Sequence, residues 1–405
     1  MRTRRTMGKE KRGHRKRTRP MSTITVVGSI KPVLGVDLGD SNSVATLLSP
    51  MNGSIVQEMF PFSMDDAGYS LFSSKVPKDA RIAYEATSQA YPFTRRLKEM
   101  GYSDTTVAHP KELAWIVKSK KKNDKADSLK IARLHMGGLI PESHLLEREE
   151  QIKRDLLIQR VQLGVEIGNV KRRIISYLKR EDVYNCLPKT EDNFSVTRRR
   201  AIDSLNFGDD RDLVIRTMMR KLRFLEAECP PLEERIRQVA AESDDVKLLI
   251  SVQGIDFYTA SLYSSFVGDA RRFPDDDHLN SFFGIIPVSR DSGDKKRRGR
   301  MSKEGPSIAR WMLGVMVDNV MRRNAEIRRY YDSVKERSGP GHAHVMAMKK
   351  LNRMLYHMLI TRQRWKWEDE GLTERKLSNI SSSSSSAPPT PTTTTTNDGG
   401  VTQEA

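Results

Sequence analysis

Val33-Leu34-Gly35-Val36-Asp37 is a short apolar run that ends on an acidic residue. Further strand candidates are residues 43–48 and 54–60, which turn residues separate, and residues 81–84, which run into Glu85. Residues 93–100 and 125–134 are helical candidates, residues 105–108 form another short strand, and residues 63–80 have only a weak helical pattern. This mixture of strands and helices predicts an α/β domain over residues 30–140.

Four acidic residues of this domain stand at positions that suit metal chemistry. Asp37 and Glu85 each close an apolar strand, which predicts that they emerge at a sheet edge. Asp124 and Asp127 are three residues apart, so they share one face of a helix or its first turn. Converging carboxylates suit Mg²⁺, and two such ions can activate a nucleophile and stabilise the leaving oxygen in phosphodiester cleavage. The spacing also allows ordinary strand-end acids and a helix N-cap.

A basic run lies directly beside the paired aspartates. Residues 118–125 contain five lysines and one aspartate, a surplus of +4. Lysines crowded against carboxylates make sense if a phosphate backbone passes between them, which makes Lys120, Lys121 and Lys122 candidate nucleic-acid contacts. A solvated loop is the alternative interpretation.

Residues 141–245 have helical periodicity, which predicts a long coiled-coil arm that acts as a spacer or an oligomerisation element. A second helical run follows, and Pro230-Pro231 predicts a break or kink in it. The apolar stripe of the first helix consists of Ile152, Leu156, Leu163, Ile167, Val170, Ile174 and Leu178.

Residues 246–370 predict a mainly helical C-terminal domain. A turn at Gln253-Gly254-Ile255 joins two short helices, as in a helix–hairpin–helix that presents backbone N–H groups to a phosphate. An ordinary helix pair with a glycine cap is the alternative.

A basic loop follows in the same block, with seven Lys or Arg and two Asp over residues 290–303. Ser292 in this loop is a candidate nucleophile, because the surrounding cations could neutralise charge that develops on phosphorus. The alternative is a plain Ser-Gly turn. The candidate nucleic-acid contacts here are Arg290, Lys295, Lys296, Arg297, Arg298, Arg300 and Lys303.

The net charge agrees with a polyanionic partner. The 405 residues include 70 Lys and Arg against 52 Asp and Glu, a formal charge of +18, which favours nucleic acid. No apolar run approaches the roughly 18 residues needed to cross a bilayer, so we expect no membrane segment. Two cysteines, Cys186 and Cys229, exclude a disulfide scaffold and fit a reducing cytoplasm.

Both ends of the sequence predict disorder. Residues 1–29 form a basic arm, of which residues 1–20 hold ten Lys or Arg and one Glu; translation from Met21 is the alternative. Residues 371–405 form a Ser/Thr-rich tail, with seven Ser and seven Thr over residues 378–405.

The motifs together resemble a known transposase family. Gly35-Val36-Asp37, Tyr84-Glu85-Ala86-Thr87 and residues 122–127 resemble the DEDD tetrad of the family that includes the pilin-gene inverting recombinase and the bridge-RNA-guided insertion-sequence recombinases. The C-terminal motifs at residues 251–255, 283–287, 291–293 and 300–305 stand in the family's order. The resemblance covers residues 33–360 and departs at Ser88, where the family usually has glycine.

This resemblance implies a RuvC-like (RNase H fold) N-terminal domain, a helical arm and a C-terminal serine transposase domain. The acidic tetrad would hold Mg²⁺, and Ser292 would form a transient phosphoserine link to DNA in a site assembled between protomers. The implied partners are donor and target double-stranded DNA, a guide RNA encoded by the element, and further copies in a dimer or tetramer. The implied location is the cytoplasm, in association with the nucleoid.

Two other classes of function compete with a recombinase. A Mg²⁺-dependent, RuvC-like structure-specific nuclease would cut with water and form no covalent intermediate. A non-enzymatic nucleic-acid-binding protein descended from a recombinase is disfavoured because all four acids and Ser292 are present.

Overall fold

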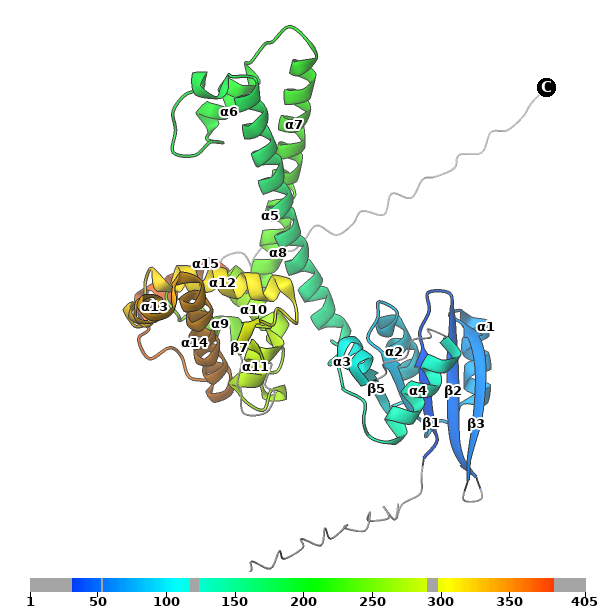
Figure 1. The fold of residues 1–405 in the computed structure, drawn as a ribbon. Coiled ribbons are helices and arrows are strands. Elements are labelled where there is room, and N and C mark those ends of the chain that lie inside the picture. Colours follow the sequence, from blue (N-terminus) through cyan, green and yellow to red (C-terminus); the bar gives the residue numbers. More distant parts are fainter. Residues whose placement is uncertain (1–30, 52–53, 117–123, 290–297, 382–405) are drawn as a thin grey trace, which may run out of the picture. The chain divides into compact units, whose positions relative to one another are not determined.

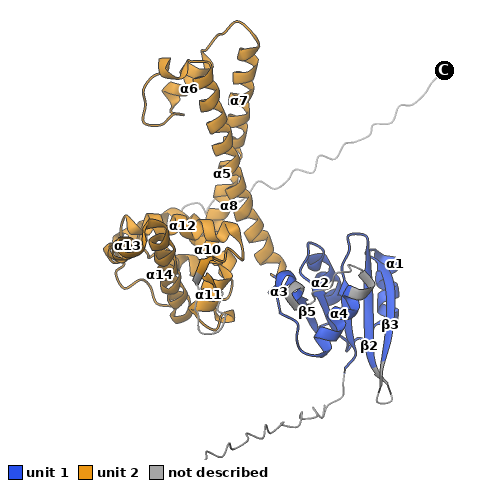
Figure 2. Ribbon diagram, in the orientation of Figure 1, with its two compact units in different colours: residues 1–145 blue, residues 146–405 orange. Residues whose placement is uncertain are grey.

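The computed structural model describes residues 31–51, 54–116, 124–289 and 298–381. Beside the gaps, Asp124, Ser289 and Arg298 are among the residues for which only the backbone is described. The chain divides into two compact units, residues 1–145 and 146–405 (Figure 2). Among the described helices, none is both long and apolar enough to cross a membrane.

The first unit is built on a mixed five-stranded sheet in the order β3-β2-β1-β4-β5 (Figure 1). Strands β1 to β3 form an antiparallel meander, whereas β1, β4 and β5 are parallel. The strands are β1 (Val33–Asp37), β2 (Asn42–Met51), β3 (Ser54–Ser63), β4 (Arg81–Glu85) and β5 (Thr105–Ala108). The predicted α/β class is confirmed, and the sheet is consistent with the RNase H-like domain that the resemblance implies.

Helices cover both faces of this sheet. Phe72 of α1 (Asp66–Lys75) and Phe93 of α2 (Ala90–Glu99) pack with Leu34, Val36 and Tyr84 in one aromatic-rich core. On the other face, α3 (Pro110–Ile116) and α4 (Asp124–Met136) pack over Ala83 and Ala108. Helix α1 lies where the sequence pattern is only weakly helical. Asp65 caps it, accepting a hydrogen bond from the N–H of Gly68, and the aromatic core holds its buried side.

The predicted helical arm is a pair of helices that pack within the chain. Helix α5 (Arg148–Arg180) runs antiparallel to α7 (Asp210–Ala227) and α8 (Cys229–Glu242), with α6 (Val196–Asp203) and a short 3-10 turn, Tyr184–Cys186, between them. The ion pairs Arg211–Glu181, Lys171–Glu226 and Arg160–Glu233 follow this antiparallel order.

One expectation for this arm changes. Ile152 does not belong to the buried stripe, since 51% of it is exposed, and Leu157 and Val161 take the inward positions. Ile174 and Leu178 pack against α7 within this chain, and the role of the arm in joining protomers stays a prediction. The break predicted at Pro230-Pro231 is confirmed, because these prolines occupy the first turn of α8, where no helical N–H is required.

The rest of the second unit is a helical core. Its helices are α9 (Asp244–Leu249), α10 (Phe257–Val267), α11 (Asp276–Phe282), α12 (Ser307–Met321), α13 (Ala325–Ser338), α14 (Pro340–Thr361) and α15 (Glu370–Ser381), with a 3-10 turn at Ala270–Arg272. Strands β6 (Pro287–Ser289) and β7 (Arg298–Met301) add a two-stranded ribbon.

Helix α15 corrects the predicted disordered tail. The sequence predicts disorder from residue 371, but Ile380 is 2% exposed and belongs to the helical core. The serine-rich composition begins inside the helix, at Ser378. It therefore overlaps the apolar residues whose side chains pack against the core, and their helical pattern is hard to recognise in the sequence. The basic arm and the tail after residue 381 lie outside the described residues.

Candidate active site

Asp37 and Glu85 lie at the carboxyl ends of neighbouring parallel strands. In the register of β1 and β4, Val36 is paired with Tyr84, and the two acids are the next residues along each strand. Parallel strands end at the same sheet edge, so the register places the two acids next to each other there, as the sequence predicts.

Both acids project toward the face that α4 covers. Side chains alternate between the faces of a strand, so Asp37 shares a face with Gly35, and Glu85 shares one with Ala83. Gly35 lies directly beneath α4, because a Cβ there would be 2.3 Å from the Ser128 carbonyl oxygen and 2.3 Å from the Ala132 nitrogen. Glycine at this position lets the helix backbone lie against β1, on the side where the acids point.

The first turn of α4 lies at the same edge. His135, in the last turn, is close enough to Arg81 and Asp104 for their charges to act on its pKa. Arg81 begins β4 and Asp104 precedes β5, so α4 ends at the amino ends of these strands. Its beginning, Asp124–Asp127, therefore lies toward their carboxyl ends.

A buried hydrogen bond holds this end of α4 on the sheet. The Oγ of Ser128 lies 2.8 Å from Oγ1 of Thr46 on β2, and both side chains are fully buried. Asp127 precedes Ser128 and accepts a hydrogen bond from the Lys130 Nζ at 2.6 Å. Lys130 is a site residue that the sequence reasoning missed. Its position three residues after Asp127 was the available signal, since residues three apart are neighbours on a helix.

The donor chemistry of this edge suits a hard divalent cation, since it consists of carboxylate oxygens. Asp37 and Glu85 share one face and one edge of the sheet, Asp127 lies in the first turn of α4 toward that edge, and the Asp124 side chain is outside the description. Among the described side chains, no group of three or more His, Cys, Asp or Glu is arranged to hold a metal ion. Lys130 also pairs with one oxygen of the Asp127 carboxylate. The role of the four acids as metal ligands therefore stays a prediction.

Ser292 and the cations near it in the sequence belong to the segment that joins β6 to β7. Residues 290–297, which include Arg290, Ser292, Lys295, Lys296 and Arg297, lie outside the described residues, as do Lys120, Lys121 and Lys122 of the other unit. Arg298 is described only by its backbone, at the start of β7. Arg300 and Lys303 are exposed on the ribbon and just after it.

Two glycines anchor the ribbon in the helical core. Gly284 has φ +66°, and a Cβ there would be 1.8 Å from the Glu304 carbonyl oxygen. Gly305 has φ +87°, and a Cβ there would be 2.0 Å from the Phe282 carbonyl oxygen. The N–H of Ser302 also donates to the Ile286 carbonyl at 2.8 Å. The motifs at residues 283–287 and 300–305 are therefore the two sides of one ribbon base.

The glycine-centred turn between α9 and α10 forms as predicted. Gly254 has φ +97° and approaches the backbone of α12, since a Cβ would be 2.7 Å from the Asn319 carbonyl oxygen. The Oγ of Ser251, also in this motif, accepts a hydrogen bond from the N–H of Trp365 at 3.1 Å and donates to the Leu248 carbonyl.

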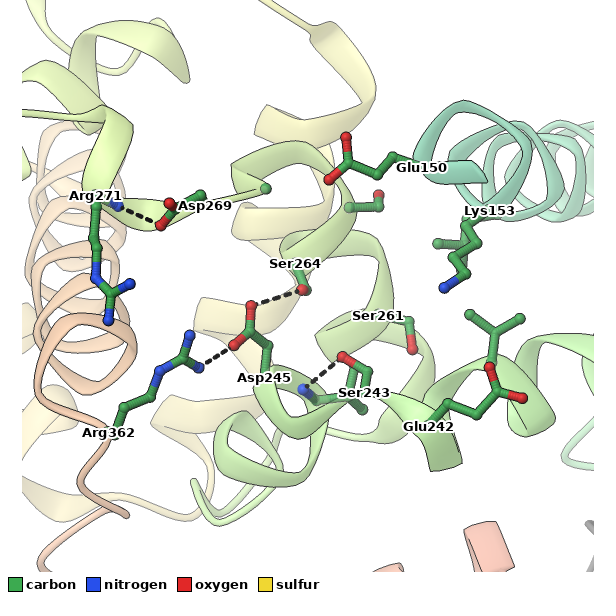
Figure 3. Close-up of a pocket in the computed structure, with 15 residues that line it drawn as sticks. Glu150, Lys153, Glu242, Ser243, Asp245, Ser261, Ser264, Asp269, Arg271 and Arg362 are labelled. Atoms are coloured by element: carbon green, nitrogen blue, oxygen red, sulfur yellow. Dashed lines mark hydrogen bonds and ion pairs between the residues drawn. The ribbon is translucent and has the colours of Figure 1, made fainter. Parts of the chain in front are cut away.

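A separate cavity of about 470 Å³ opens between α5, α9 and α10 (Figure 3). Inside it, Asp245 lies between Ser264 and Arg362 and interacts with both, as Figure 3 shows. No residue that the sequence predicts as functional lines it. The cavity is lined by Glu150, Lys153, Leu157, Val239, Glu242, Ser243, Asp245, Val246, Ser261, Ser264, Ser265, Gly268, Asp269, Arg271 and Arg362.

Comparison with known proteins finds a family match that contains the C-terminal motifs. Residues 246–332 match a family described as Transposase IS116/IS110/IS902 family. The transposase for insertion sequence element IS1533 of Leptospira borgpetersenii is 26% identical over 196 residues, 47% of this chain and 56% of the relative.

Two shorter matches agree with this one. The transposase for insertion sequence element IS1111A of Coxiella burnetii is 29% identical over 136 residues, 32% of this chain and 37% of the relative. The insertion element IS110 uncharacterized 43.6 kDa protein of Streptomyces coelicolor is 24% identical over 148 residues, 36% of each chain. The chain thus spans about half the length of the first relative and about a third of the other two. The resemblance stated from the motifs is confirmed: this chain is similar to insertion-sequence transposases of the IS116/IS110/IS902 family.

Proposed function

We propose that this chain is an insertion-sequence transposase that cuts and rejoins double-stranded DNA. The observation that carries the proposal is the match of residues 246–332 to the transposase family, because this segment contains the ribbon and the loop with Ser292. The transposases named among the relatives support the same activity, and the charge of +18 supports a nucleic-acid substrate.

In this proposal Asp37, Glu85, Asp124 and Asp127 hold Mg²⁺ at the carboxyl edge of the first unit's sheet. The shared face of Asp37 and Glu85, and the direction of α4, support this assignment. Bound Mg²⁺ would supply Lewis-acid stabilisation of negative charge on the oxygens of the reacting phosphate. Lys130 keeps the Asp127 carboxylate paired until the metal and the DNA arrive.

Ser292 acts as the nucleophile. Its Oγ forms a bond to phosphorus while the bond from phosphorus to a deoxyribose oxygen breaks, and the departing oxygen takes up a proton. The serine proton passes to a basic group or to water. Attack by a free deoxyribose hydroxyl on the phosphoserine reverses these steps, rejoins the strand and releases Ser292. Arg300 and Lys303, exposed at the base of the loop, provide positive charge toward the phosphate.

The choice of donor and target DNA is assigned to a guide RNA encoded by the element, and the active form is a homo-oligomer. The resemblance supports both assignments.

The test is covalent trapping. The gene is expressed with its native flanking DNA, so that any guide RNA is present, and DNA-linked protein is sought under denaturing conditions. Ser292→Ala and Asp127→Asn are expected to abolish the adduct. Ser302→Ala, in the same ribbon, and Asp104→Asn, near the opposite end of α4, are the matched controls and are expected to retain it.

A second outcome favours the nuclease. If Ser292→Ala still cuts DNA, no adduct forms in the wild type and Asp127→Asn abolishes cutting, the protein is a metal-dependent, RuvC-like nuclease. The arrangement of the acids at one sheet edge supports this alternative independently of the loop.

A further inference from the structure

Another cavity of the C-terminal unit lies between α11, α13, α14 and the segment that follows α14. Its volume is about 480 Å³, within the range of about 300–1,000 Å³ that is typical of small-ligand sites. Among the described residues, none that the sequence predicts as functional lines this cavity. The proposed strand chemistry does not use it.

A buried amide in the wall of this cavity has a donor without a partner. Asn280 of α11 lines the cavity and is 1% exposed. Its Oδ1 accepts a hydrogen bond from Nδ2 of Asn352 at 2.9 Å, whereas its own Nδ2 has no acceptor recorded among the described residues. A buried polar group without a partner is costly, so this nitrogen calls for an acceptor that a ligand supplies.

A buried hydrogen-bond chain determines which atom of Asn280 is left over. Burial raises the pKa of the Tyr263 hydroxyl, so this group stays protonated and donates to Oδ1 of Asn352 at 2.8 Å. Asn352 then has only its amide nitrogen to offer to Asn280. The Nδ2 of Asn280 is therefore the end of the chain and the one donor that it presents to the cavity.

Aromatic and thioether side chains form the apolar part of the wall. Trp365 is 9% exposed, and its N–H donates to Oγ of Ser251 at 3.1 Å, which fixes the backbone that carries the ring. Tyr330 is half-buried, and the Lys350 Nζ lies 4.8 Å from the centre of its ring. Flat, polarisable surfaces of this kind suit the aromatic ring of a nucleobase.

Positive charge is in excess at this cavity, which has four cations and two acids in its lining. Two of the cations are paired. Lys350 lies 2.9 Å from Glu326, and Arg353 lies 2.6 Å from Asp276, a residue outside the lining. These pairs hold α13 and α11 against α14.

Two lysines remain for a ligand. Neither Lys349 nor Lys366 has an ion pair recorded within the described part of the chain, and Lys366 lies 4.8 Å from the ring centre of Trp367. Asp277, the other acid of the lining, is close enough to Arg353 for its charge to act on that guanidinium. The two ammonium groups can therefore meet phosphates beside a ligand in the cavity.

We propose that this cavity binds one unpaired thymidine nucleotide of single-stranded DNA. The Asn280 amide donates to a carbonyl oxygen of the base, while the base ring lies against Tyr330 and Trp365. The inference rests on the proposed function only in taking DNA as the source of the nucleotide, because cutting and rejoining a duplex exposes nucleotides that are transiently unpaired.

The remaining side chains of the lining favour thymidine. Met346 and Met354 provide apolar contact for the C5-methyl group, which distinguishes thymine from uracil. Adenine has no carbonyl oxygen for the Asn280 amide. Lys349 and Lys366 contact the phosphates on the two sides of the bound nucleotide.

The test measures binding of the full-length protein to fluorescent 12-nucleotide strands by anisotropy. The strands are oligo(dT), oligo(dU) and an abasic strand with the same number of phosphates. We expect the wild type to bind oligo(dT) about tenfold more tightly than the abasic strand, because of stacking, and about threefold more tightly than oligo(dU), because of the methyl contact.

Two kinds of variant test the site. Tyr330→Ala and Asn280→Leu should reduce the preference for oligo(dT) over the abasic strand to about twofold. Because Asn280→Leu also takes an acceptor from Asn352, Lys349→Gln/Lys366→Gln is measured beside it and leaves the buried chain intact. This double variant should weaken binding of all three strands alike and lower the slope of log K against log [KCl] by about 1.

Matched controls separate the cavity from aromatic surface and from net charge. Trp311→Ala removes an exposed ring of α12 outside the cavity and should keep the tenfold preference. Lys335→Gln/Arg337→Gln removes two charges from exposed positions on α13 and should keep the slope. Equal losses in a variant and its control, or a wild type that binds oligo(dT) no better than the abasic strand, would overturn the site.

Two further ligands test the identity of the nucleotide. Oligo(rU) that binds more tightly than oligo(dT), in a manner that Tyr330→Ala abolishes, would overturn the assignment to DNA. Thymidine 5′-monophosphate is titrated alone by calorimetry. Binding of this free nucleotide that depends on Tyr330, with no preference among the strands, would overturn the assignment to a strand.

The same preparations distinguish this inference from the proposed function. Wild-type protein that shows the preference for oligo(dT) but forms no adduct and cuts no strand disproves the transposase proposal alone. Wild-type protein that forms the adduct but shows no preference among the three strands disproves the nucleotide site alone.

Discussion

Oγ of Ser128 on α4 and Oγ1 of Thr46 on β2 lie 2.8 Å apart, and both are completely buried. They are 82 residues apart in the chain. Together with Gly35, which admits the helix backbone, this contact determines where the first turn of α4 meets the sheet. Asp127 precedes Ser128, so the hydrogen bond also positions a proposed metal ligand.

Replacing Thr46 by valine tests this contact. Thr46→Val keeps the shape and removes the hydroxyl, so we expect the free energy of unfolding to fall by about 1 kcal/mol. Urea denaturation measures the loss, and Thr46→Ser, which keeps the hydroxyl, separates it from the methyl group. We also expect adduct formation by Thr46→Val to need more Mg²⁺. Unchanged stability and unchanged Mg²⁺ dependence would show that packing alone positions α4.

Lys130 competes with metal for the Asp127 carboxylate. The pair is partly exposed, with 28% and 29% of the two side chains accessible, so its strength is modest, about 0.2–1 kcal/mol. Lys130→Met should therefore lower the Mg²⁺ concentration for half-maximal strand cleavage by about fivefold at most. Lys75→Met, which removes an equally paired lysine of α1, is the control. A higher Mg²⁺ requirement in Lys130→Met would mean that Lys130 supports the site rather than competing for it.

His135 predicts an acid-sensitive first unit. Burial, and then the charge of Arg81, lower the pKa of His135 to about 4, and its Nε2 has no hydrogen-bond partner among the described residues. The folded state disfavours the protonated imidazole of His135. The contribution of neutral His135 to the free energy of unfolding is therefore complete above about pH 6.5 and is lost as the pH falls toward 4. The loss amounts to about 3 kcal/mol at most.

The pH dependence is measured as the difference between wild type and His135→Gln in urea denaturation at several pH values. The difference isolates this residue from the other titrating groups. We expect the wild type to lose more stability than the variant between pH 6.5 and 4. Parallel curves for the two proteins would exclude His135 as the cause.

The ribbon base depends on the glycines that close it. Gly284→Ala adds a Cβ 1.8 Å from the Glu304 carbonyl oxygen and also strains a positive φ. Gly339→Ala strains φ alone, because nothing lies within 4 Å of its Cβ. We expect about 1 kcal/mol of destabilisation for Gly339→Ala and at least twice that for Gly284→Ala. Thermal denaturation compares them, and equal losses would mean that the ribbon adapts to the added methyl group.

Lys376 should matter more for folding than Arg375, the other cation of α15. Lys376→Met removes the donor from the Ile250 and Ile255 carbonyls, whereas the Val252 carbonyl keeps the N–H of Ile255, and we expect a cost of about 2–4 kcal/mol. Arg375→Met is the matched control, because the exposed Arg375 guanidinium donates to the Gly371 carbonyl within the same helix. Limited proteolysis near residue 370 together with urea denaturation compares the two. Equal stability would show that water replaces the ammonium without cost.

Local sequence patterns were enough to predict the strands that carry Asp37 and Glu85, because a short apolar run that ends on an acid involves only neighbouring residues. It also identified the turn at Gly254 and the break before α8, since glycine and proline act on the backbone where they stand. The resemblance of the motifs to insertion-sequence transposases needed nothing more than their order.

Other features depend on contacts between residues that are far apart in the chain, so they became visible only in the folded structure. The parallel register of β1 and β4 joins residues almost fifty positions apart, and only this register brings the two acids to one edge. The inward face of α5 shifts from Ile152 to Leu157 because α8 and α10 cover that side. Helix α15 is ordered although its end is rich in serine, because Ile380 is buried and Lys376 bonds to a turn more than 120 residues earlier. These contacts join segments that no local pattern relates, so their energies enter only when the chain has folded.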